Sequence, residues 1–134
     1  MNRATWYFDF VSPFAYLHHL SLDEFSEQLF IDRKPLLFAG LLKHWGTKGP
    51  AELLSKRIFT YRYIQWYANS LNIPFRFPER HPFNPIPLLS LCIVKGCSKD
   101  AGDSIFIDAP ELKTDTKNDE TNKQSGGRVE TTFR

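Results

Sequence analysis

The sequence predicts an α/β protein organised around a β-α-β unit near its N-terminus. Residues 5–10 are rich in aromatic side chains and follow the two-residue period of a strand. A Ser-Pro pair at positions 12 and 13 follows, where a helix would begin, and residues 34–38 have the composition of a second strand. A strand, a helix and a strand in this order favour a right-handed parallel crossover.

The first helix is predicted to begin at Ser12 and Pro13. Serine is a favoured N-cap residue, and proline suits the first helical position because its missing N–H would have no helical acceptor there. Apolar side chains recur at three- and four-residue steps at Phe14, Leu17, Phe25 and Leu29, so this helix can dock on the sheet. The Ser12 hydroxyl would lie beside free N–H groups at the positive end of the helix, which suits a bound thiolate, although a plain capping role is the alternative.

Mainly helical structure is expected after the second strand. A Gly-rich break at residues 46–50 separates a short helical turn over 40–45 from a long helix over 51–71. Residues 75–78 should be extended, and an apolar helix is expected over 88–95.

The chain of 134 residues should form one domain. Eighteen of its 20 aromatic residues precede Cys97, whereas residues 113–128 are almost entirely polar and cannot bury enough apolar surface to fold. We therefore expect a folded part over 1–97 and a disordered tail over 98–134, within which residues 104–108 could form one isolated strand.

Charge and hydropathy limit the partners that the chain can have. The net charge of +2 and the scattered basic residues do not match a nucleic-acid-binding surface. No apolar run is long enough to cross a bilayer, and Asp9 interrupts the first apolar segment. We expect a cytoplasmic protein that binds neither nucleic acid nor membrane.

The cysteines and histidines give no clear catalytic or metal-binding pattern. Cys92 and Cys97 are separated by four residues, which matches neither a C-x-x-C redox pair nor half of a zinc site, so plain buried or free thiols are expected. His18 and His19 point about a hundred degrees apart on a helix, which favours surface positions. A structural role is expected for His81, which lies in a proline-rich loop with no partner spaced for a triad.

Five segments, taken in order, carry a resemblance to a known family. They are Phe-Asp-Phe-x-Ser-Pro-Phe-x-Tyr-Leu at 8–17, residues 40–50, Lys-Arg at 56–57, Leu-Asn-Ile-Pro-Phe-x-Phe-Pro at 71–78 and His-Pro-Phe-Asn-Pro at 81–85. Over about residues 4–97 the chain resembles 2-hydroxychromene-2-carboxylate isomerase, a family related to the kappa-class glutathione transferases. The resemblance implies the DsbA-like branch of the thioredoxin fold, with a helical insertion.

The resemblance also implies a cofactor and a reaction. Ser12 would hydrogen-bond the glutathione sulfur and favour its thiolate, in place of the nucleophilic cysteine of redox relatives. Lys56 would reach the glutathione peptide, and Thr47 stands where the family usually has an asparagine. Glutathione would add reversibly to a small aromatic substrate, and elimination would follow bond rotation. Two parallel strands with one covering helix would leave an exposed strand edge and an uncovered face, which favours association, and a homodimer is one expected form.

The sequence departs from the family after Cys97. A strand pair and a closing helix should follow there, and none is visible, so the resemblance implies a fold that lacks its C-terminal ββα part. The alternatives are an inactive family member, a binding module, or a kappa-class glutathione transferase. Thiol–disulfide exchange at the start of the first helix is excluded, because Ser12-Pro13-Phe14-Ala15 replaces the C-x-x-C sequence.

Overall fold

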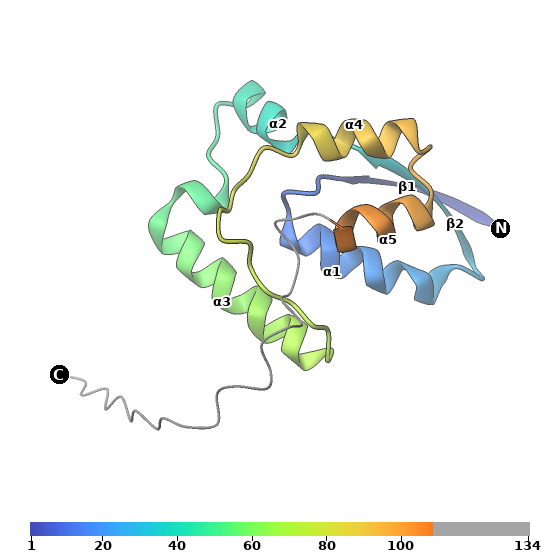
Figure 1. Cartoon of the computed structure of the whole chain (residues 1–134), viewed down its shortest axis with the longest axis horizontal. Coiled ribbons are helices and arrows are strands. Elements are labelled where there is room, and N and C mark those ends of the chain that lie inside the picture. The colour runs from blue at the N-terminus through green and yellow to red at the C-terminus, as the bar shows by residue number, and fades with distance from the viewer. Residues whose placement is uncertain (109–134) are drawn as a thin grey trace.

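The computed structural model describes residues 1–108, which form a mixed α/β structure with a small two-stranded sheet and five α-helices (Figure 1). In chain order, the elements are β1 (Asn2–Phe8), α1 (Pro13–Ser21), a 3-10 turn (Leu22–Phe25), β2 (Leu29–Pro35), α2 (Phe38–His44), a second 3-10 turn (Pro50–Glu52), α3 (Leu54–Ser70), α4 (Ile86–Val94) and α5 (Lys99–Asp108).

The sheet consists of β1 and β2 in parallel, which confirms the predicted β-α-β order. Pairing runs from Asn2 opposite Leu29 to Phe8 opposite Pro35. The second strand therefore occupies residues 29–35, and its expected position over 34–38 is wrong. Beyond Pro35 the Leu36 N–H still donates to the Phe8 carbonyl, but the chain then turns into α2.

The first helix begins where the sequence predicts. Ser12 is the N-cap, in an extended conformation, and its Oγ accepts a hydrogen bond from the Ala15 N–H at 3.3 Å. The helix ends at Ser21, well before the expected end at Leu29. Because β2 runs parallel to β1, its first residue, Leu29, lies opposite Asn2, and residues 22–28 connect the end of α1 to that point.

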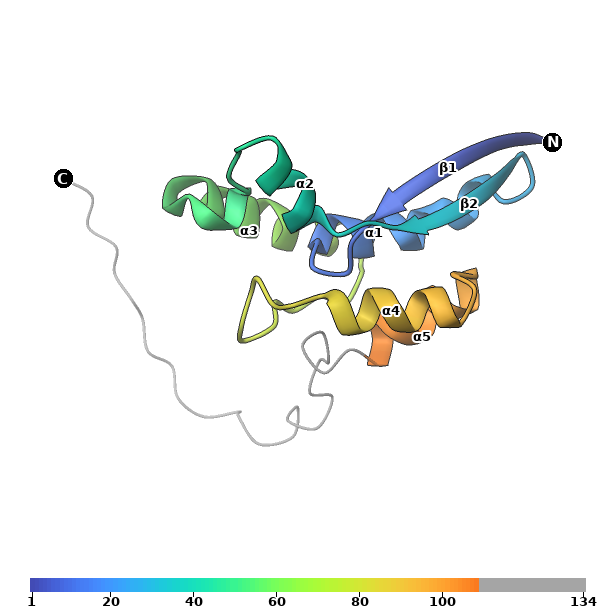
Figure 2. The same ribbon diagram turned by 90° about the horizontal axis from the view of Figure 1, so that it is seen from above.

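The main core lies between the sheet, α1, α4 and α5. Phe8 and Phe10 extend from the end of β1 into a buried cluster to which every neighbouring helix contributes. Its other buried members are Ala15 from α1, Leu89 and Cys92 from α4, and Ile105 and Phe106 from α5. Figure 2 shows α4 and α5 together in a layer on one side of the two strands.

A second buried cluster joins α1 to α3. Leu17, Ile64 and Ala68 are almost fully buried, and they are covered by aromatic residues of both helices and by apolar residues of the segment after α3. This contact holds α3 beside α1, so α3 covers α1 on the side away from the sheet (Figure 1).

The folded part extends beyond the boundary that the sequence indicated at Cys97. Residues 99–108 form α5, and Ala101, Ile105 and Phe106 are buried on its inner face, so the isolated strand expected over 104–108 is wrong. Ser98 caps this helix through its hydroxyl, which accepts from the Ala101 N–H at 3.2 Å. The rest of the expected tail, residues 109–134, lies outside the described residues.

His19 is buried, contrary to the surface position expected for it. Its side chain is 2% exposed, and its Nε2 lies 2.8 Å from Oδ1 of Asp103 on α5. The ring also lies against the backbone of Gly102. Burial lowers the pKa of His19, although the hydrogen bond with Asp103 opposes this effect. His18 is exposed, as the sequence predicts.

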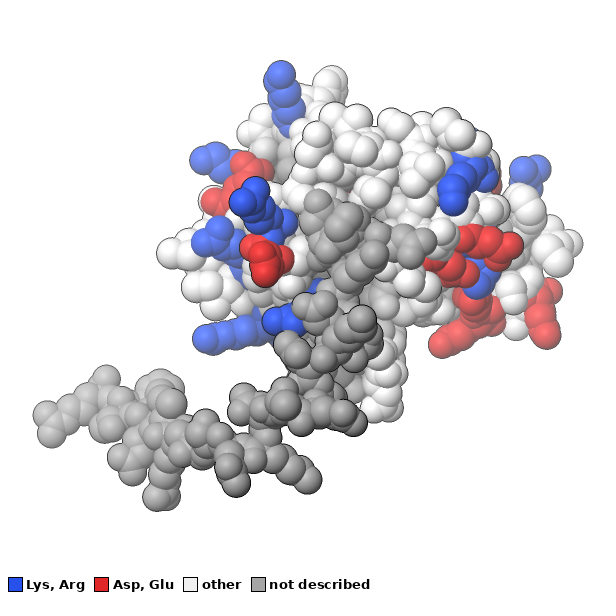
Figure 3. Space-filling model, in the orientation of Figure 1, with Lys and Arg blue, Asp and Glu red and all other residues white. Residues whose placement is uncertain are grey.

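Charged side chains are spread over the described surface. On the face seen in Figure 3, basic and acidic side chains are mixed over α3, and acidic side chains gather at the opposite end of the molecule. Among the charged side chains, Lys99 pairs with Asp23 and Asp103. This view shows no continuous basic stripe along residues 1–108. Over the same residues, no helix is long and apolar enough to cross a membrane.

Candidate functional site

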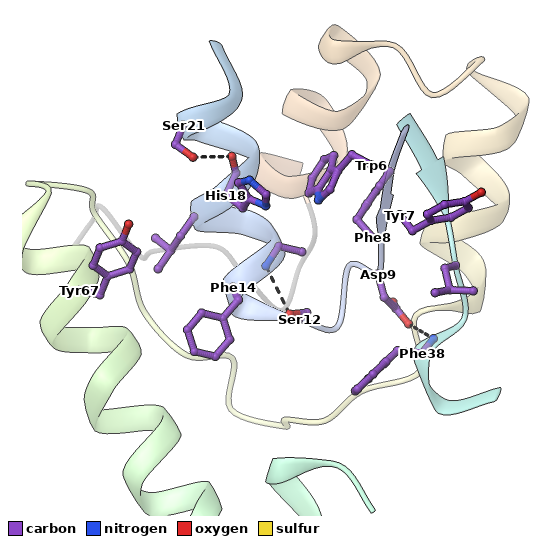
Figure 4. Close-up of a pocket in the computed structure, with 13 residues that line it drawn as sticks. Trp6, Tyr7, Phe8, Asp9, Ser12, Phe14, His18, Ser21, Phe38 and Tyr67 are labelled. Carbon is purple, nitrogen blue, oxygen red and sulfur yellow. Dashed lines mark hydrogen bonds between the residues drawn. The ribbon is translucent and has the colours of Figure 1, made fainter. Parts of the chain in front are cut away.

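A buried carboxylate organises the turn between β1 and α1. Asp9 is 4% exposed, and its two oxygens accept hydrogen bonds from the Val11 N–H at 3.1 Å and the Phe38 N–H at 2.8 Å. The Ser12 N–H donates to the Asp9 carbonyl at 3.1 Å, which closes the turn. Asp9 therefore joins the residues before Ser12 to the first residue of α2 (Figure 4). Burial raises the pKa of Asp9, while the two backbone N–H groups act in the opposite direction.

Ser12 is half-buried at the end of this turn and lines two cavities. Its Oγ accepts one backbone hydrogen bond, so the hydroxyl hydrogen remains available to a further acceptor. The first-turn N–H groups of a helix have no acceptors within the helix, and the helix dipole is positive at this end. Ser12 thus presents a donor to both cavities in a region that favours negative charge.

The first cavity, of about 530 Å³, lies between β1 and α1, and we call it the strand-side cavity. Figure 4 shows Trp6, Tyr7 and Phe8 on the strand side of it, and Phe14 and Tyr67 on the side toward α3. Its walls are largely aromatic and aliphatic. Apart from Ser12 and Asp9, its polar side chains come from His18, Ser21, Tyr7 and Tyr67.

The second cavity, of about 680 Å³, lies between the start of α1, α2 and the loop at 81–85, and we call it the helix-side cavity. It meets the strand-side cavity at Ser12, Phe14 and Phe38, which line both. Its apolar walls include Leu42, Phe83 and several prolines. Besides Ser12, its polar side chains are those of Lys43, Thr47, Glu52, Thr60, Tyr61 and His81.

The structure brings together two of the three residues that the sequence singled out. Ser12 and Thr47 line the helix-side cavity, Thr47 from the exposed loop between α2 and the second 3-10 turn. Lys56 is an exposed residue in the first turn of α3 and lines neither cavity. The cation at this cavity is Lys43 of α2 instead.

A histidine in the helix-side cavity supports the residue that precedes Ser12. His81 Nε2–H donates to the Val11 carbonyl at 2.7 Å, which leaves Nδ1 as the acceptor for the Tyr61 hydroxyl. The Tyr61 hydroxyl also lies 3.2 Å from the His81 carbonyl. Burial lowers the pKa of His81, and the hydrogen bond to Val11 opposes this effect. A neutral imidazole with this tautomer fits both neighbours.

Sequence reasoning missed three side chains of the site: Asp9, Lys43 and Tyr61. His81 lies in the His-Pro-Phe-Asn-Pro segment, and its hydrogen bond to Val11 fits the structural role that the sequence predicts for it. Asp9 follows a strand and precedes a helix cap, where a carboxylate commonly accepts backbone N–H bonds. Tyr61 gives no comparable signal, because its partner His81 is 20 positions away in the sequence, and Lys43 joins the site only as a residue that lines the helix-side cavity.

The arrangement suits an anion or a thiolate next to apolar groups. A hydroxyl donor and a helix N-terminus lie where two largely apolar cavities join, and one lysine borders the larger cavity. Among residues 1–108, no group of three or more His, Cys, Asp or Glu side chains is placed to hold a metal ion. Models of known protein families, curated proteins and solved structures all fail to match this chain.

Proposed function

We propose that this chain is a glutathione-dependent isomerase of the 2-hydroxychromene-2-carboxylate type, built on a DsbA-like thioredoxin arrangement of β1, α1 and β2. The observation that carries the proposal is the position of Ser12, which caps α1 and borders both cavities. The parallel β1-α1-β2 order and the family-like segments support the same assignment.

The residues around Ser12 fit glutathione in part. The hydroxyl and the start of α1 would hold the sulfur, and Thr47 and Lys43 border the helix-side cavity, where the peptide could lie. A lysine is a suitable partner for either glutathione carboxylate. Because Lys56 lines neither cavity, we assign the cationic contact to Lys43 and leave Lys56 out of the proposed site.

Bound glutathione would supply a thiolate that adds reversibly to the substrate and leaves after bond rotation. Ser12 Oγ–H would donate to the sulfur and stabilise its charged form, and the helix N-terminus would add to that effect. Lowering a thiol pKa by one unit increases the thiolate fraction about tenfold near neutral pH. Ser12 would remain a hydrogen-bond donor throughout and would form no covalent bond.

The strand-side cavity is the proposed substrate site. It adjoins Ser12 and is bounded by Trp6, Phe8, Phe14 and Tyr67, whose rings can pack against an aromatic substrate. Ser12 and Phe14 both border the two cavities. A sulfur held by Ser12 would therefore lie next to the Phe14 ring, at the point where the glutathione and substrate cavities meet. The apolar walls would limit the access of water to the reacting groups.

Calorimetric titration with glutathione tests the cofactor, and turnover of 2-hydroxychromene-2-carboxylate tests the reaction. We expect saturable binding that weakens in Ser12→Ala and is unchanged in Ser90→Ala, a matched control on the exposed face of α4. Glutathione-dependent turnover by the parent chain, lost in Ser12→Ala, would complete the test. Absence of glutathione binding by the parent chain would contradict the proposal, and binding without turnover would reduce it to a glutathione-binding module.

A further inference from the structure

The two cysteines of the chain lie side by side at the end of α4. Cys92 is 1% exposed and belongs to the main core, whereas Cys97 is half-buried and packs against the same cluster. Their Sγ atoms are 3.0 Å apart. We propose that Cys92 and Cys97 form a dithiol site that small-molecule disulfides oxidise to an intramolecular disulfide. This site is separate from Ser12, and the proposal does not depend on the function proposed above.

The backbone at the end of α4 brings the two side chains together. The Cys97 N–H donates to the Cys92 carbonyl at 2.8 Å, and the Gly96 N–H donates to the Ile93 carbonyl at 3.0 Å. These two bonds form the Schellman arrangement of a helix C-terminus, in which the third residue from the end contacts the second residue beyond the cap. An apolar pair usually makes that contact, and here it is made by two thiols.

The conformation of Cys97 fixes the contact further. Gly96 and Cys97 both have positive φ, 75° and 49° respectively. Glycine adopts this region freely, but cysteine does so at a cost that the surroundings must offset. The hydrogen bond to Cys92 and the packing of Cys97 on the core supply that support. The sulfur of Cys97 is therefore held over that of Cys92 by the backbone itself.

The environments of the two thiols set the order of reaction. Burial raises the pKa of Cys92 to about 12, with a further contribution from the hydrogen bond and charge of Cys97. The half-buried Cys97 is the accessible thiol of the two, so it reacts first. Burial still raises the pKa of Cys92 after Cys97 has reacted, so the second step depends on the short distance of 3.0 Å between the two sulfur atoms.

Glutathione disulfide serves as the oxidant in the proposed exchange. Cys97 loses its proton and attacks one sulfur of the oxidant, releasing one glutathione thiolate and forming a mixed disulfide. Cys92 then loses its proton and attacks the Cys97 sulfur, which releases the second glutathione thiolate. The protein gives up two electrons and two protons, and one glutathione disulfide becomes two glutathione thiols. Reduction by excess thiol reverses the sequence.

Peptide mapping tests the site without any substitution, because trypsin cleaves after Lys95, between the two cysteines. Fully reduced full-length protein is incubated with glutathione disulfide, alkylated and digested. We expect peptides 81–95 and 96–99 to be joined until they are reduced, and the intact chain to lose the mass of two hydrogens. Two alkylated cysteines, two stable glutathione adducts, or a disulfide between two chains would overturn the proposal.

Two variants and a second oxidant test the order of the steps. Cys92→Ala should retain one glutathione on Cys97, and Cys97→Ala should react far more slowly because Cys92 is buried. Bis(2-hydroxyethyl) disulfide should give the same linked peptides in the parent chain, which separates this site from any glutathione-binding pocket. Faster reaction at Cys92 than at Cys97 would contradict the assigned order.

Discussion

His81 donates its Nε2–H to the carbonyl oxygen of Val11 at 2.7 Å, although 70 positions separate the two residues in the sequence. The bond connects the proline-rich loop before α4 to the residue that precedes the Ser12 cap. Tyr61, from α3, donates to the other ring nitrogen. Three distant segments of the chain therefore meet behind Ser12, and their contacts determine how firmly the start of α1 is held.

Removing this imidazole should destabilise the protein. In His81→Phe the half-buried Val11 carbonyl loses its donor, and an unsatisfied buried acceptor typically costs about 1–3 kcal/mol. The free energy of unfolding, measured with a denaturant, should fall by that amount. His44→Phe, at an exposed position on α2, should change it by less than about 0.5 kcal/mol. Equal effects of the two substitutions would contradict the role given to His81.

Truncating the buried aromatic side chain of α5 should destabilise the protein strongly. Phe106 is 2% exposed and its ring contacts Phe8, Phe10 and Tyr16, so Phe106→Ala should cost about 3–5 kcal/mol. Ile107→Ala is the matched control, because the side chain of Ile107, the next residue in α5, is 66% exposed. Chemical denaturation measures both. If Phe106→Ala were as stable as the parent chain, α5 would not belong to the core.

Two helical glycines should respond to alanine in opposite ways. A Cβ at Gly102 would lie 2.7 Å from Cε1 of the buried His19 ring, which would force the ring or α5 to move at a cost of about 1–3 kcal/mol. At Gly40 in α2 the nearest atom is the terminal methyl of Leu37, at 3.7 Å. Gly40→Ala should therefore be neutral or stabilising by up to about 1 kcal/mol. Thermal unfolding of both variants tests the packing of α5 on His19.

Stability should fall as the pH is lowered through the range in which histidine titrates. Burial lowers the pKa of His19 and of His81 below the usual value of 6.5, so the unfolded chain binds protons at a higher pH than the folded chain does. The contribution of these two histidines to the free energy of unfolding is complete above pH 6.5, and it is lost as the pH falls toward their pKa values in the folded state. The effect of Asp9 on stability has the opposite sign. Because burial raises the pKa of Asp9, its carboxyl group binds a proton at a higher pH in the folded chain than in the unfolded chain.

The pH effect is isolated by comparing variants. The free energy of unfolding of the parent chain and of His19→Gln is measured between about pH 7.5 and pH 5.5. The difference between the two should shrink as the pH falls, because only the parent chain loses the contribution of a neutral His19. The charged groups that act on His19 are Asp103, Arg33 and Lys99. The pKa of Asp103 is lowered and that of Lys99 is raised, so neither of these two partners titrates in this range. A constant difference would contradict a lowered pKa for His19.

The sequence predicted the parts of the structure that depend on local chemistry. The Ser12 cap, Pro13 at the first helical position and the strand before them follow from residue preferences over a few positions. The break at 46–50 and the long helix after it were predicted for the same reason. The β-α-β order also followed, since few connections are available to such a unit.

The errors all arise from contacts between distant residues. β2 includes Asp32 and Arg33, whose residue types favour a turn, and they belong to a strand because they pair with β1. α5 has a modest apolar content that becomes a core face only when Phe106 meets Phe8 and Phe10. His19 is buried because Asp103, 84 positions away, gives it a partner. No local pattern encodes these pairings.

The candidate site also contains residues that local sequence identifies and residues that it does not. Ser12 could be identified from its own neighbourhood, and Thr47 lies in a loop that the sequence delimited well. Only the resemblance points to Thr47 and Lys56; Thr47 lines the helix-side cavity, whereas Lys56 lies outside both cavities. Lys43 borders the cavity because α2 begins at Phe38, directly against the carboxylate of Asp9. The sequence predicts the helical turn that contains Lys43, but no local pattern shows that this turn borders the same cavity as Ser12.

The central claim is that Ser12 stabilises a thiolate of bound glutathione. The most direct test follows the ultraviolet absorbance of the thiolate against pH for glutathione bound to the parent chain, to Ser12→Ala and to Ser12→Thr. We expect the pKa of the bound thiol to lie about one unit or more below the value near 8.5 of a free thiol, and to rise again in Ser12→Ala. Ser12→Thr, which keeps a hydroxyl at the cap, should retain most of the shift. Identical titrations for the parent chain and Ser12→Ala would contradict the claim.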